Sequence, residues 1–404
     1  MKVTVLRLGH LGDGVADGPV YVAGGLPGEE VEGDISGDRI AQPRIVTPSP
    51  DRVRAACAHY RACGGCGLMH ASDSFVAGWK LDVVRLALTA QGLAAEFRPV
   101  ATSPAGSRRR ATLAGRRTKS GAIVGFHGRA SGTITEIPDC RLLHPALIAT
   151  LPALREITVI GASRKGGLDL AVTLTTGGPD LAVTGGKPMD ATLFQGLAGI
   201  AEQVGLSRVT WDGEAAVLRH PPAQRIGRAT VVPPPGAFLQ ATREGEAALV
   251  GSVLEATEGA GRIADLFAGC GTFALPLAER AEVHAVEGDT AMIEAALAGS
   301  RTVQGLKRLT GAARDLFRRP LLPDELARFD AVVIDPPRAG AEAQTREIAR
   351  SGLARVAAVS CNPVTFARDA RILADAGFRL DWVQVVDQFR WSPHVELAAQ
   401  FTRS

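Results

Sequence analysis

The chain has 404 residues, of which 46% are hydrophobic and 22% charged, and its formal net charge at pH 7 is +3. This length suits about two or three domains, and the composition excludes a disordered or fibrous protein. No apolar run approaches the length of a membrane span and the N-terminus lacks a secretory signal pattern, so we expect a cytoplasmic protein with no membrane partner.

Residues 1–50 contain short strand-like runs separated by glycine, proline and aspartate, namely VTVLRL, GPVYVAG, EEVEGDI and RIAQPRIV. So many strands in so few residues favour a small barrel of the oligonucleotide-binding type, whose open face holds RNA in many proteins. A barrel that only caps another domain is the alternative. We therefore predict a separate β-barrel over 1–50.

Residues 51–230 are predicted to form a small α+β central domain. Its first part is a helix over residues 74–97, which Ser72 or Ser74 can cap and which is able to pack on the following domain. Beyond residue 100, strand-like runs alternate with glycine-rich turns. This mixture predicts no particular fold within the α+β class.

The run VVPPPGAF, which begins at residue 231, suits neither a helix nor a central strand and marks a domain boundary. Beyond it, helix-like segments alternate with strands such as RIADLFA, AEVHAVEG, FDAVVIDPP and VAAVSCNP. These strands are apolar without alternation, as in a sheet covered on both faces. Residues 231–404 are therefore predicted to form a doubly wound, Rossmann-like α/β domain that binds ligands at the carboxyl ends of its strands.

A cofactor site is predicted in RIADLFAGCGTFALPLAERAEVHAVEGD, which has the order strand, glycine turn, helix, strand and acid. Gly269 and Gly271 let the backbone approach a ligand, and Glu287 can accept hydrogen bonds from ribose hydroxyls. By itself the pattern also fits a nicotinamide dinucleotide. Asp265 can meet an ammonium group, and the later motif DPPRAG suits a methyl acceptor site, so S-adenosylmethionine is favoured over a dehydrogenase cofactor.

Cys361 directly follows an apolar strand and precedes Asn362. A thiolate that adds to C6 of a pyrimidine makes C5 nucleophilic towards a methyl sulfonium, after which a base must remove the C5 proton. The helix expected just after Cys361 would favour the thiolate. Glu396, at the start of the last strand between apolar neighbours, is the candidate base, and His394 is the alternative.

The motifs DLFAGCGTFALPLA, DPPRAG, SCNPVTFARD and HVEL, together with GDGVADGPVYVAGGLPGE near the N-terminus, resemble the bacterial 5-methyluridine RNA methyltransferases, above all the branch that modifies 23S ribosomal RNA. The resemblance implies a TRAM module over residues 1–50, a nucleophile at Cys361, a base at Glu396 and a substrate-site acid at Asp335. The chain departs from the family at Arg390, where proline is usual.

The residues expected to contact S-adenosylmethionine are Gln240, Asp265, Phe267, Gly269, Gly271, Glu287 and Asp335. RNA 5-methylcytidine enzymes carry a second cysteine beside the DPP motif, which this chain lacks, so uridine is favoured. We expect a monomer that acts on 23S ribosomal RNA. A transfer-RNA target is one alternative, and a non-catalytic RNA-binding factor for ribosome assembly is another.

Four more cysteines form one potential set of metal ligands, namely Cys57, Cys63, Cys66 and Cys140. Four thiolates suit zinc or an iron–sulfur cluster, and their spacing does not choose between them. The family resemblance implies a [4Fe-4S] cluster on these four residues. His59 and His70 are alternative ligands, and Cys270 is expected to be a small buried filler.

Arginines gather in one span of the central region, at Arg108, Arg109, Arg110, Arg116, Arg117 and Arg129. Their guanidinium groups suit phosphate, so the span is a candidate RNA-contacting surface. A solvated charged face is the alternative.

Overall fold

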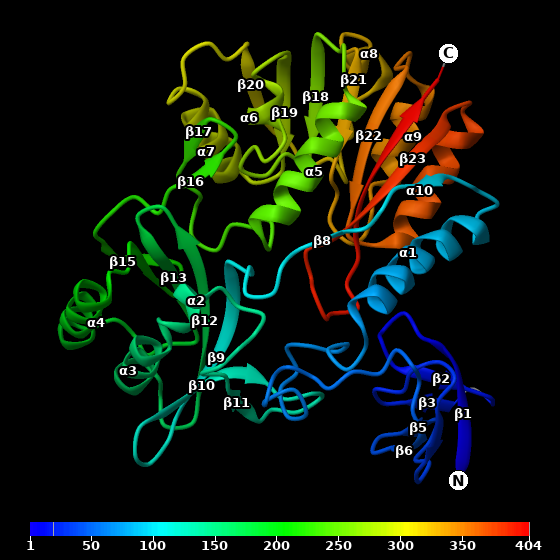
Figure 1. The fold of residues 1–404 in the computed structure, drawn as a ribbon. Helices are drawn as coiled ribbons and strands as arrows, with labels where there is room; N and C mark the ends of the chain where they lie inside the picture. Colours follow the sequence, from blue (N-terminus) through cyan, green and yellow to red (C-terminus); the bar gives the residue numbers. More distant parts are fainter. Residues whose placement is uncertain (19, 404) are drawn as a thin grey trace.

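The computed structural model describes residues 1–18 and 20–403. Pro19, which falls in the predicted strand GPVYVAG, and Ser404, the last residue of the predicted catalytic domain, lie outside the described residues. The described chain forms three larger sheets and one two-stranded sheet (Figure 1), which follow one another from a small N-terminal sheet to a large sheet near the C-terminus.

The N-terminal sheet has the strand order β5-β3-β2-β1-β4-β6. Its strands are β1 (Lys2–Leu8), β2 (Gly14–Ala16), β3 (Val20–Val22), β4 (Glu30–Glu32), β5 (Arg39–Ile40) and β6 (Arg44–Thr47). β1 pairs with both β2 and β4, and a register shift between Val5 and Arg7 bends it so that one strand serves both neighbours. Val22, Val31 and Ile40 are fully buried in its core.

The middle sheet has the order β11-β10-β9-β12-β13-β14-β15, with only β13 and β14 parallel among the described strands. The strands are β9 (Arg110–Arg117), β10 (Ala122–His127), β11 (Ile134–Glu136), β12 (Gly167–Thr175), β13 (Gly178–Thr184), β14 (Arg208–Trp211) and β15 (Glu214–Leu218). Its helices are α2 (Pro145–Ile148), α3 (Leu151–Gly161) and α4 (Ala191–Val204). α3 and α4 pack on the sheet through buried leucine and isoleucine side chains such as Leu154, Ile157 and Leu197.

Local signals explain where α4 begins and ends. Asp190 accepts a hydrogen bond from the Leu193 amide at 2.7 Å, and Gly205 ends the helix at φ +71°.

The sequence analysis anticipated neither α3 nor β9. In β9, arginines and glycines replace the alternating apolar pattern that would have indicated a strand.

The large sheet has the order β20-β19-β18-β21-β22-β24-β23-β7, and β8 also pairs with β23. Its strands are β7 (Glu96–Phe97), β8 (Ala101–Thr102), β18 (Arg262–Leu266), β19 (Glu282–Glu287), β20 (Leu309–Ala313), β21 (Ala331–Ile334), β22 (Arg355–Ser360), β23 (Arg379–Asp387) and β24 (Glu396–Thr402). The first five strands in that order are parallel, whereas β24 lies antiparallel between β22 and β23. The direction of the strand order reverses at β18, which is where such sheets bind ligands.

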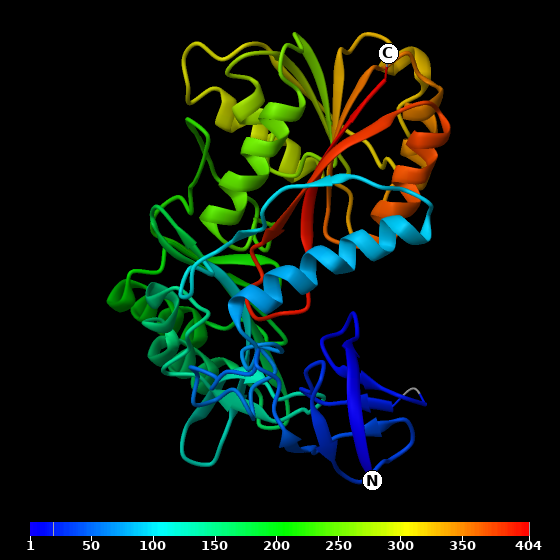
Figure 2. The same ribbon diagram turned by 45° about the vertical axis from the view of Figure 1, so that its right-hand side comes forward.

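Helices cover both faces of the large sheet, as Figure 2 shows. They are α1 (Asp73–Ala90), α5 (Arg243–Ala256), α6 (Ala274–Leu277), α7 (Thr290–Ser300), α8 (Pro323–Leu326), α9 (Glu342–Arg350) and α10 (Pro363–Asp375). Consecutive residues of β21 alternate between the two faces: Val332 packs in the core under α9 and α10, and Val333 packs in the core under α5. Both faces are apolar, which explains the continuous hydrophobic runs in the sequence.

Besides β7 and β8, which pair with β23, helix α1 and a hairpin from outside 231–404 pack with the large sheet. In α1, Val84 and Leu88 join the core that includes Leu397 and Phe401. The hairpin of β16 (Gln224–Ile226) and β17 (Ala229–Val231) packs against α7 and shares a cluster with Cys270. The boundary that the proline run predicts at residue 231 therefore coincides with the last residue of β17, and β17 already packs with the helices of the large sheet.

Helix α1 ends at Ala90 and so is shorter than the helix predicted over residues 74–97. Ser72 caps it by accepting a hydrogen bond from the Phe75 amide, and Val76 and Trp79 pack against Leu8 of the N-terminal sheet. Leu86 is 68% exposed, whereas Val84 and Leu88, two residues before and after it, are buried. Of the helices in the described ranges 1–18 and 20–403, none combines the length and apolar character of a transmembrane span.

Candidate active site

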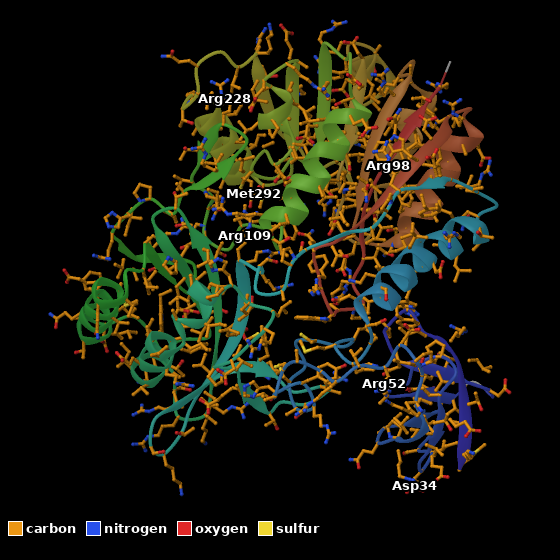
Figure 3. All side chains as sticks on the ribbon, viewed as in Figure 1. Asp34, Arg52, Arg98, Arg109, Arg228 and Met292 are labelled. Carbon is orange, nitrogen blue, oxygen red and sulfur yellow. The ribbon has the colours of Figure 1, made fainter. Side chains whose placement is uncertain are left out.

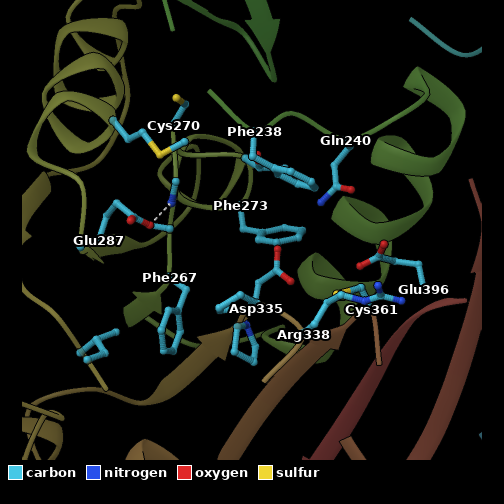
Figure 4. Close-up of a pocket in the computed structure, with 18 of the residues that line it drawn as sticks. Phe238, Gln240, Phe267, Cys270, Phe273, Glu287, Asp335, Arg338, Cys361 and Glu396 are labelled. Atoms are coloured by element: carbon cyan, nitrogen blue, oxygen red, sulfur yellow. Dashed lines mark hydrogen bonds between the residues drawn. The ribbon is translucent and has the colours of Figure 1, made fainter. Parts of the chain in front are cut away.

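A cavity of about 650 Å³ opens at the carboxyl ends of the parallel strands β18, β19, β21 and β22. Figure 4 shows residues of the predicted cofactor and catalytic motifs projecting into it from different strands. The middle sheet contributes Arg108 and Arg110 to the same wall. The site is therefore built between two parts of the chain, in the size range of pockets for small ligands.

The glycine turn after β18 forms one end of the cavity. Phe267 has φ +62°, an uncommon conformation for a non-glycine residue, and Gly269 has φ +55°. The Gly269 amide donates a hydrogen bond of 2.9 Å to a carboxylate oxygen of Glu287, which ties the turn to the end of β19. Open space lies where a Cβ of Gly269 would stand, so the backbone is accessible from the cavity.

Gly271 has a different role from Gly269. Its φ is +88°, and an added Cβ would lie 3.1 Å from the Cβ of Ala296 in α7. This glycine packs the turn against a helix and does not line the cavity.

Asp265 lies at the end of β18 and is completely buried, beneath the cavity and not in its wall. Burial raises its pKa to about 8; the nearby Ala274 amide acts in the opposite direction, and the charge of Glu287 raises it further. Within the described part of the chain, neither carboxylate oxygen has a hydrogen-bond partner. A buried carboxyl without a partner is costly, so Asp265 is suited to meet a polar ligand group.

Cys361 and Glu396 border the other end of the cavity, beside Asp335 (Figure 4). Cys361 follows β22, and Glu396 begins β24, which pairs directly with β22. Burial raises the pKa of the Cys361 thiol to about 11, the neighbouring Glu396 and Asp335 raise it further, and Arg338 lowers it.

Helix α10 begins directly after this thiol. Asn362 caps α10, and its side-chain oxygen accepts the Val364 amide at 3.1 Å. Burial and the two neighbouring carboxyls act against the thiolate that the helix terminus is expected to favour.

Glu396 is 3% exposed, and burial raises its pKa to about 7. A hydrogen bond from Gln388 and the charge of Arg110 act in the opposite direction. His394, the alternative base, also lines the cavity, and its Nδ1 lies 3.1 Å from Nη2 of Arg338. Burial lowers the pKa of His394, and Arg338 lowers it further.

Asp335 lies after β21, and its amide donates a hydrogen bond of 3.2 Å to the Leu266 carbonyl. Burial raises its pKa well above the usual range, and the carboxyls of Glu396 and Asp265 raise it further. Like-charged groups that interact in this way oppose one another's ionisation, so a bound cation would favour their charged forms.

Most of the predicted site residues meet at this cavity. Its lining includes Gln240, Phe267, Gly269, Glu287, Asp335, Cys361 and Glu396. The sequence analysis did not single out the aromatic side chains of Phe238 and Phe389, which also line it. The guanidinium carbon of Arg110 lies 4.4 Å from the ring centre of Phe238, and that of Arg108 lies 5.6 Å from the ring centre of Phe389.

The arginine span divides between two environments. Arg108 and Arg110 face the cavity, whereas Arg109 is buried and donates to the Gln240 carbonyl at 3.0 Å and to Glu246 of α5. Figure 3 shows Arg109 at the junction of the middle and large sheets. The prediction that Arg109 contacts phosphate is therefore wrong, because alternate residues of an extended chain point to opposite sides.

The four remaining cysteines line one small cavity of about 20 Å³ in the segment around Cys57–Cys66 and Cys140. Burial raises the pKa of Cys66 to about 12, and the other three cysteines raise it further, so the four thiols interact. In residues 1–18 and 20–403, no three or more His, Cys, Asp or Glu side chains are grouped so as to hold one metal ion. Neither His59 nor His70 lines this cavity, and Nδ1 of His70 is bonded to the Tyr60 hydroxyl at 2.5 Å.

Comparison with known proteins identifies the family. A family model described as tRNA (Uracil-5-)-methyltransferase matches residues 233–404. An uncharacterized RNA methyltransferase of Caulobacter vibrioides is 45% identical, over 99% of this chain and 99% of its own. The 23S rRNA (uracil(1939)-C(5))-methyltransferase RlmD of Halomonas elongata is 35% identical, over 98% of this chain and 88% of its own.

A solved structure shares the fold over the whole chain. The Pyrococcus abyssi tRNA (uracil-54, C5)-methyltransferase in complex with S-adenosyl-L-homocysteine superposes with a TM-score of 0.78 at 24% identity, and the match covers 99% of both chains. These relationships confirm the family resemblance in the sequence motifs and the Rossmann-like methyltransferase fold. The chain belongs to the family of S-adenosylmethionine-dependent RNA uracil-C5 methyltransferases.

Proposed function

We propose that this protein forms 5-methyluridine in 23S ribosomal RNA. The observation that carries the proposal is that Cys361 and Glu396 border one end of a cavity whose other end holds the glycine turn and Glu287. A thiol and a carboxyl are the two groups that C5 methylation of a pyrimidine requires. The 35% identical RlmD supports the ribosomal target.

The protein groups act in two steps. The Cys361 thiol gives up its proton to solvent, and the thiolate sulfur bonds to C6 of the target uridine. The electron pair of the C5–C6 double bond moves towards the ring carbonyl, which makes C5 nucleophilic. S-adenosylmethionine, when bound, supplies a methyl group as the electrophile. Once C5 carries the methyl group, the Glu396 carboxylate removes the C5 proton, the C5–C6 double bond re-forms and the Cys361 sulfur leaves.

The residues at the glycine turn fit the cofactor. The unpartnered, buried carboxyl of Asp265 suits an ammonium group, and the open space at Gly269 lets a ligand reach the backbone. We infer that the cofactor is held by Gln240, Asp265, Phe267, Gly269, Gly271, Glu287 and Asp335. Gly271 contributes by shaping the turn, and Asp335 borders both the cofactor and the uridine.

Substituting the two catalytic residues tests the mechanism. Cys361→Ala should abolish methyl transfer while S-adenosylhomocysteine still binds. Glu396→Gln should trap the RNA on Cys361 as an adduct that survives denaturing gel electrophoresis. Glu294→Gln, the same change on the exposed face of α7, should form no lasting adduct. An active Cys361→Ala enzyme would exclude the mechanism, and absence of an adduct in Glu396→Gln would assign the base elsewhere.

The target is tested by incubating the protein and labelled S-adenosylmethionine with 23S ribosomal RNA or transfer RNA. We expect 5-methyluridine at a defined position of the ribosomal transcript. Transfer only to transfer RNA would favour the alternative target. No transfer to either RNA would favour a binding factor without catalytic activity.

We also infer that Cys57, Cys63, Cys66 and Cys140 hold a [4Fe-4S] cluster. The four thiols line one cavity and influence one another's pKa, and four cysteine thiolates are the ligand set of such a cluster. The resemblance to the 23S ribosomal RNA branch of the family favours iron–sulfur over zinc. An anaerobic preparation should be brown and contain about four irons per chain, whereas a colourless protein with one zinc would contradict the inference.

A further inference from the structure

Gln388 connects the predicted cofactor side of the cavity with the predicted base, although it does not line the cavity itself. It follows β23, is 1% exposed, and its side-chain amide makes three hydrogen bonds. Oε1 accepts from the Ala241 amide at 2.7 Å. Nε2 donates to Oε1 of Gln240 at 2.6 Å and to Oε2 of Glu396 at 2.9 Å.

The orientation of this amide is determined by its partners. The Ala241 N–H only donates, so the group of Gln388 that faces it must be the carbonyl oxygen. Nε2 therefore faces the other way, where two acceptors use both of its hydrogens. The alternative orientation would place a carbonyl oxygen against the Glu396 carboxylate.

The same bond orients Gln240. Because Oε1 of Gln240 receives the Gln388 hydrogen, its NH₂ group is left to face the cavity that Gln240 lines. Figure 4 shows the Gln240 nitrogen directed towards the centre of the site. The cavity is thereby offered a donor at this position.

Glu396 receives a donor that favours its charged form. The other groups that face Glu396 are Arg110 from β9, Asp335 after β21 and Cys361 after β22, and His394 lies two residues before it. Arg110 and Gln388 favour the carboxylate, and burial and the acidic neighbours oppose it. Gln388 donates directly to Glu396 at 2.9 Å and is itself held by the backbone amide of Ala241.

The fold holds Gln388 in place from both sides. Gly245 of α5 leaves room for it, since an added Cβ there would lie 2.5 Å from the Cβ of Gln388. On either side of Gln388 along the chain, Lys80 of α1 donates to the Asp387 carboxylate at 2.5 Å and to the Phe389 carbonyl at 3.2 Å. This side chain is therefore a rigid part of the site.

We propose that Gln388 is a positioning residue that fixes the donor end of the Gln240 amide towards the cofactor and keeps Glu396 ready to accept a proton. The inference rests on the proposed roles of Gln240 and Glu396. It gives the one buried amide of Gln388 a part both in cofactor binding, through Gln240, and in proton removal, through Glu396.

Gln388→Met tests this role, because methionine keeps the length of the side chain and removes all three hydrogen bonds. The acidic limb of kcat against pH should move upwards by about one pH unit, because the carboxylate loses a donor. The affinity for S-adenosylhomocysteine, measured by calorimetry, should fall about fivefold because the Gln240 amide is free to rotate.

The matched control is Gln344→Met. Gln344 is also 1% exposed and bonds to the backbone of Leu321 at 2.7 and 3.1 Å, away from the cavity. It should lose stability without moving the pH limb or the affinity. Should Gln388→Met fail to fold, Gln388→Glu keeps the bond from Ala241 and places an acid beside Glu396, so the limb should again move upwards.

Glu396→Gln, assayed in parallel, separates the two proposals. An adduct in Glu396→Gln together with an unchanged pH limb and affinity in Gln388→Met would overturn the positioning role and leave the function intact. Absence of the adduct would assign the base elsewhere and would remove the proposed role of Gln388 at Glu396. If, in addition, Gln388→Met binds S-adenosylhomocysteine with unchanged affinity, the proposed orientation of the Gln240 amide by Gln388 is overturned as well.

Discussion

At the scale of single residues, the site combines a thiol with three carboxyl groups in one buried region. Burial raises the pKa of Cys361 to about 11 and that of Glu396 to about 7. Asp335 and Asp265 are shifted in the same direction. Burial therefore favours the uncharged forms of these groups in the ligand-free site, whereas Arg338 favours the thiolate at Cys361.

The raised pKa of Glu396 predicts the pH dependence of the step that releases the product. A carboxylate is the active form of the base, and its fraction falls about tenfold for each pH unit below the pKa. Adduct breakdown should be independent of pH well above 7 and slow progressively below it. Rapid-quench measurements of preformed adduct between acidic and alkaline pH check this. If the rate of adduct breakdown fell only near the ordinary pKa of glutamate, the raised pKa of Glu396 would be contradicted.

At the scale of elements, helix α1 holds the segment between β23 and β24 that leads to Glu396. Lys80 is fully buried and paired with Asp387, whereas Arg390 pairs with Asp73 at the surface. The segment is also held at Trp391, whose carbonyl accepts from the Gly67 and Leu68 amides at 2.7 and 2.8 Å. The segment between β23 and β24 is thus bonded both to α1 and to the segment that carries Cys57, Cys63 and Cys66.

The two ion pairs of α1 should differ strongly in their contribution to stability. Lys80→Met leaves the Asp387 carboxylate buried without its cation and should cost about 3 to 5 kcal/mol of unfolding free energy. Asp73→Asn removes a pair whose carboxylate is 59% exposed, which contributes less than about 1 kcal/mol. Urea unfolding of both variants compares them directly. Similar losses of unfolding free energy in the two variants would show that burial does not determine how much each ion pair contributes.

At the scale of the whole molecule, the cavity exists because the middle sheet is fixed against the large sheet. Arg109 makes this junction by bonding Gln240 and Glu246, and its neighbours Arg108 and Arg110 then face the cavity from the other side of the same chain segment. A substitution of Arg109 should therefore alter the positions of residues that line the cavity, although the Arg109 side chain does not line the cavity itself.

Arg109→Met should leave Glu246 without its partner and weaken the junction. Both side chains are mostly buried, so we expect a loss of about 3 kcal/mol in unfolding free energy. KM for RNA should rise, because Arg108 and Arg110 lose their fixed position. Adding Glu246→Gln should recover part of the stability but not KM. A normal KM in the single variant would show that the junction does not position the arginines.

Local patterns predicted much of the large unit. Continuous apolar runs indicated β18, β19, β21 and β22, and the residues directly after them include Phe267, Asp335 and Cys361. The edge strand β20 was not anticipated, because its residues are only half buried and it carries a glycine. In the middle sheet, β9 and α3 were missed, since their burial depends on partners far away in the chain.

By itself, the sequence determined the α/β class, the family and the identity of the thiol, acid and glycine residues, because these depend on residue type and local order. Tertiary structure alone decided that Gln388 meets Gln240 and Glu396, that Arg109 is buried while its neighbours face the cavity, and that burial raises the pKa of Cys361. Hydrogen bonds between distant segments and the loss of water around a charge arise only when the segments pack together.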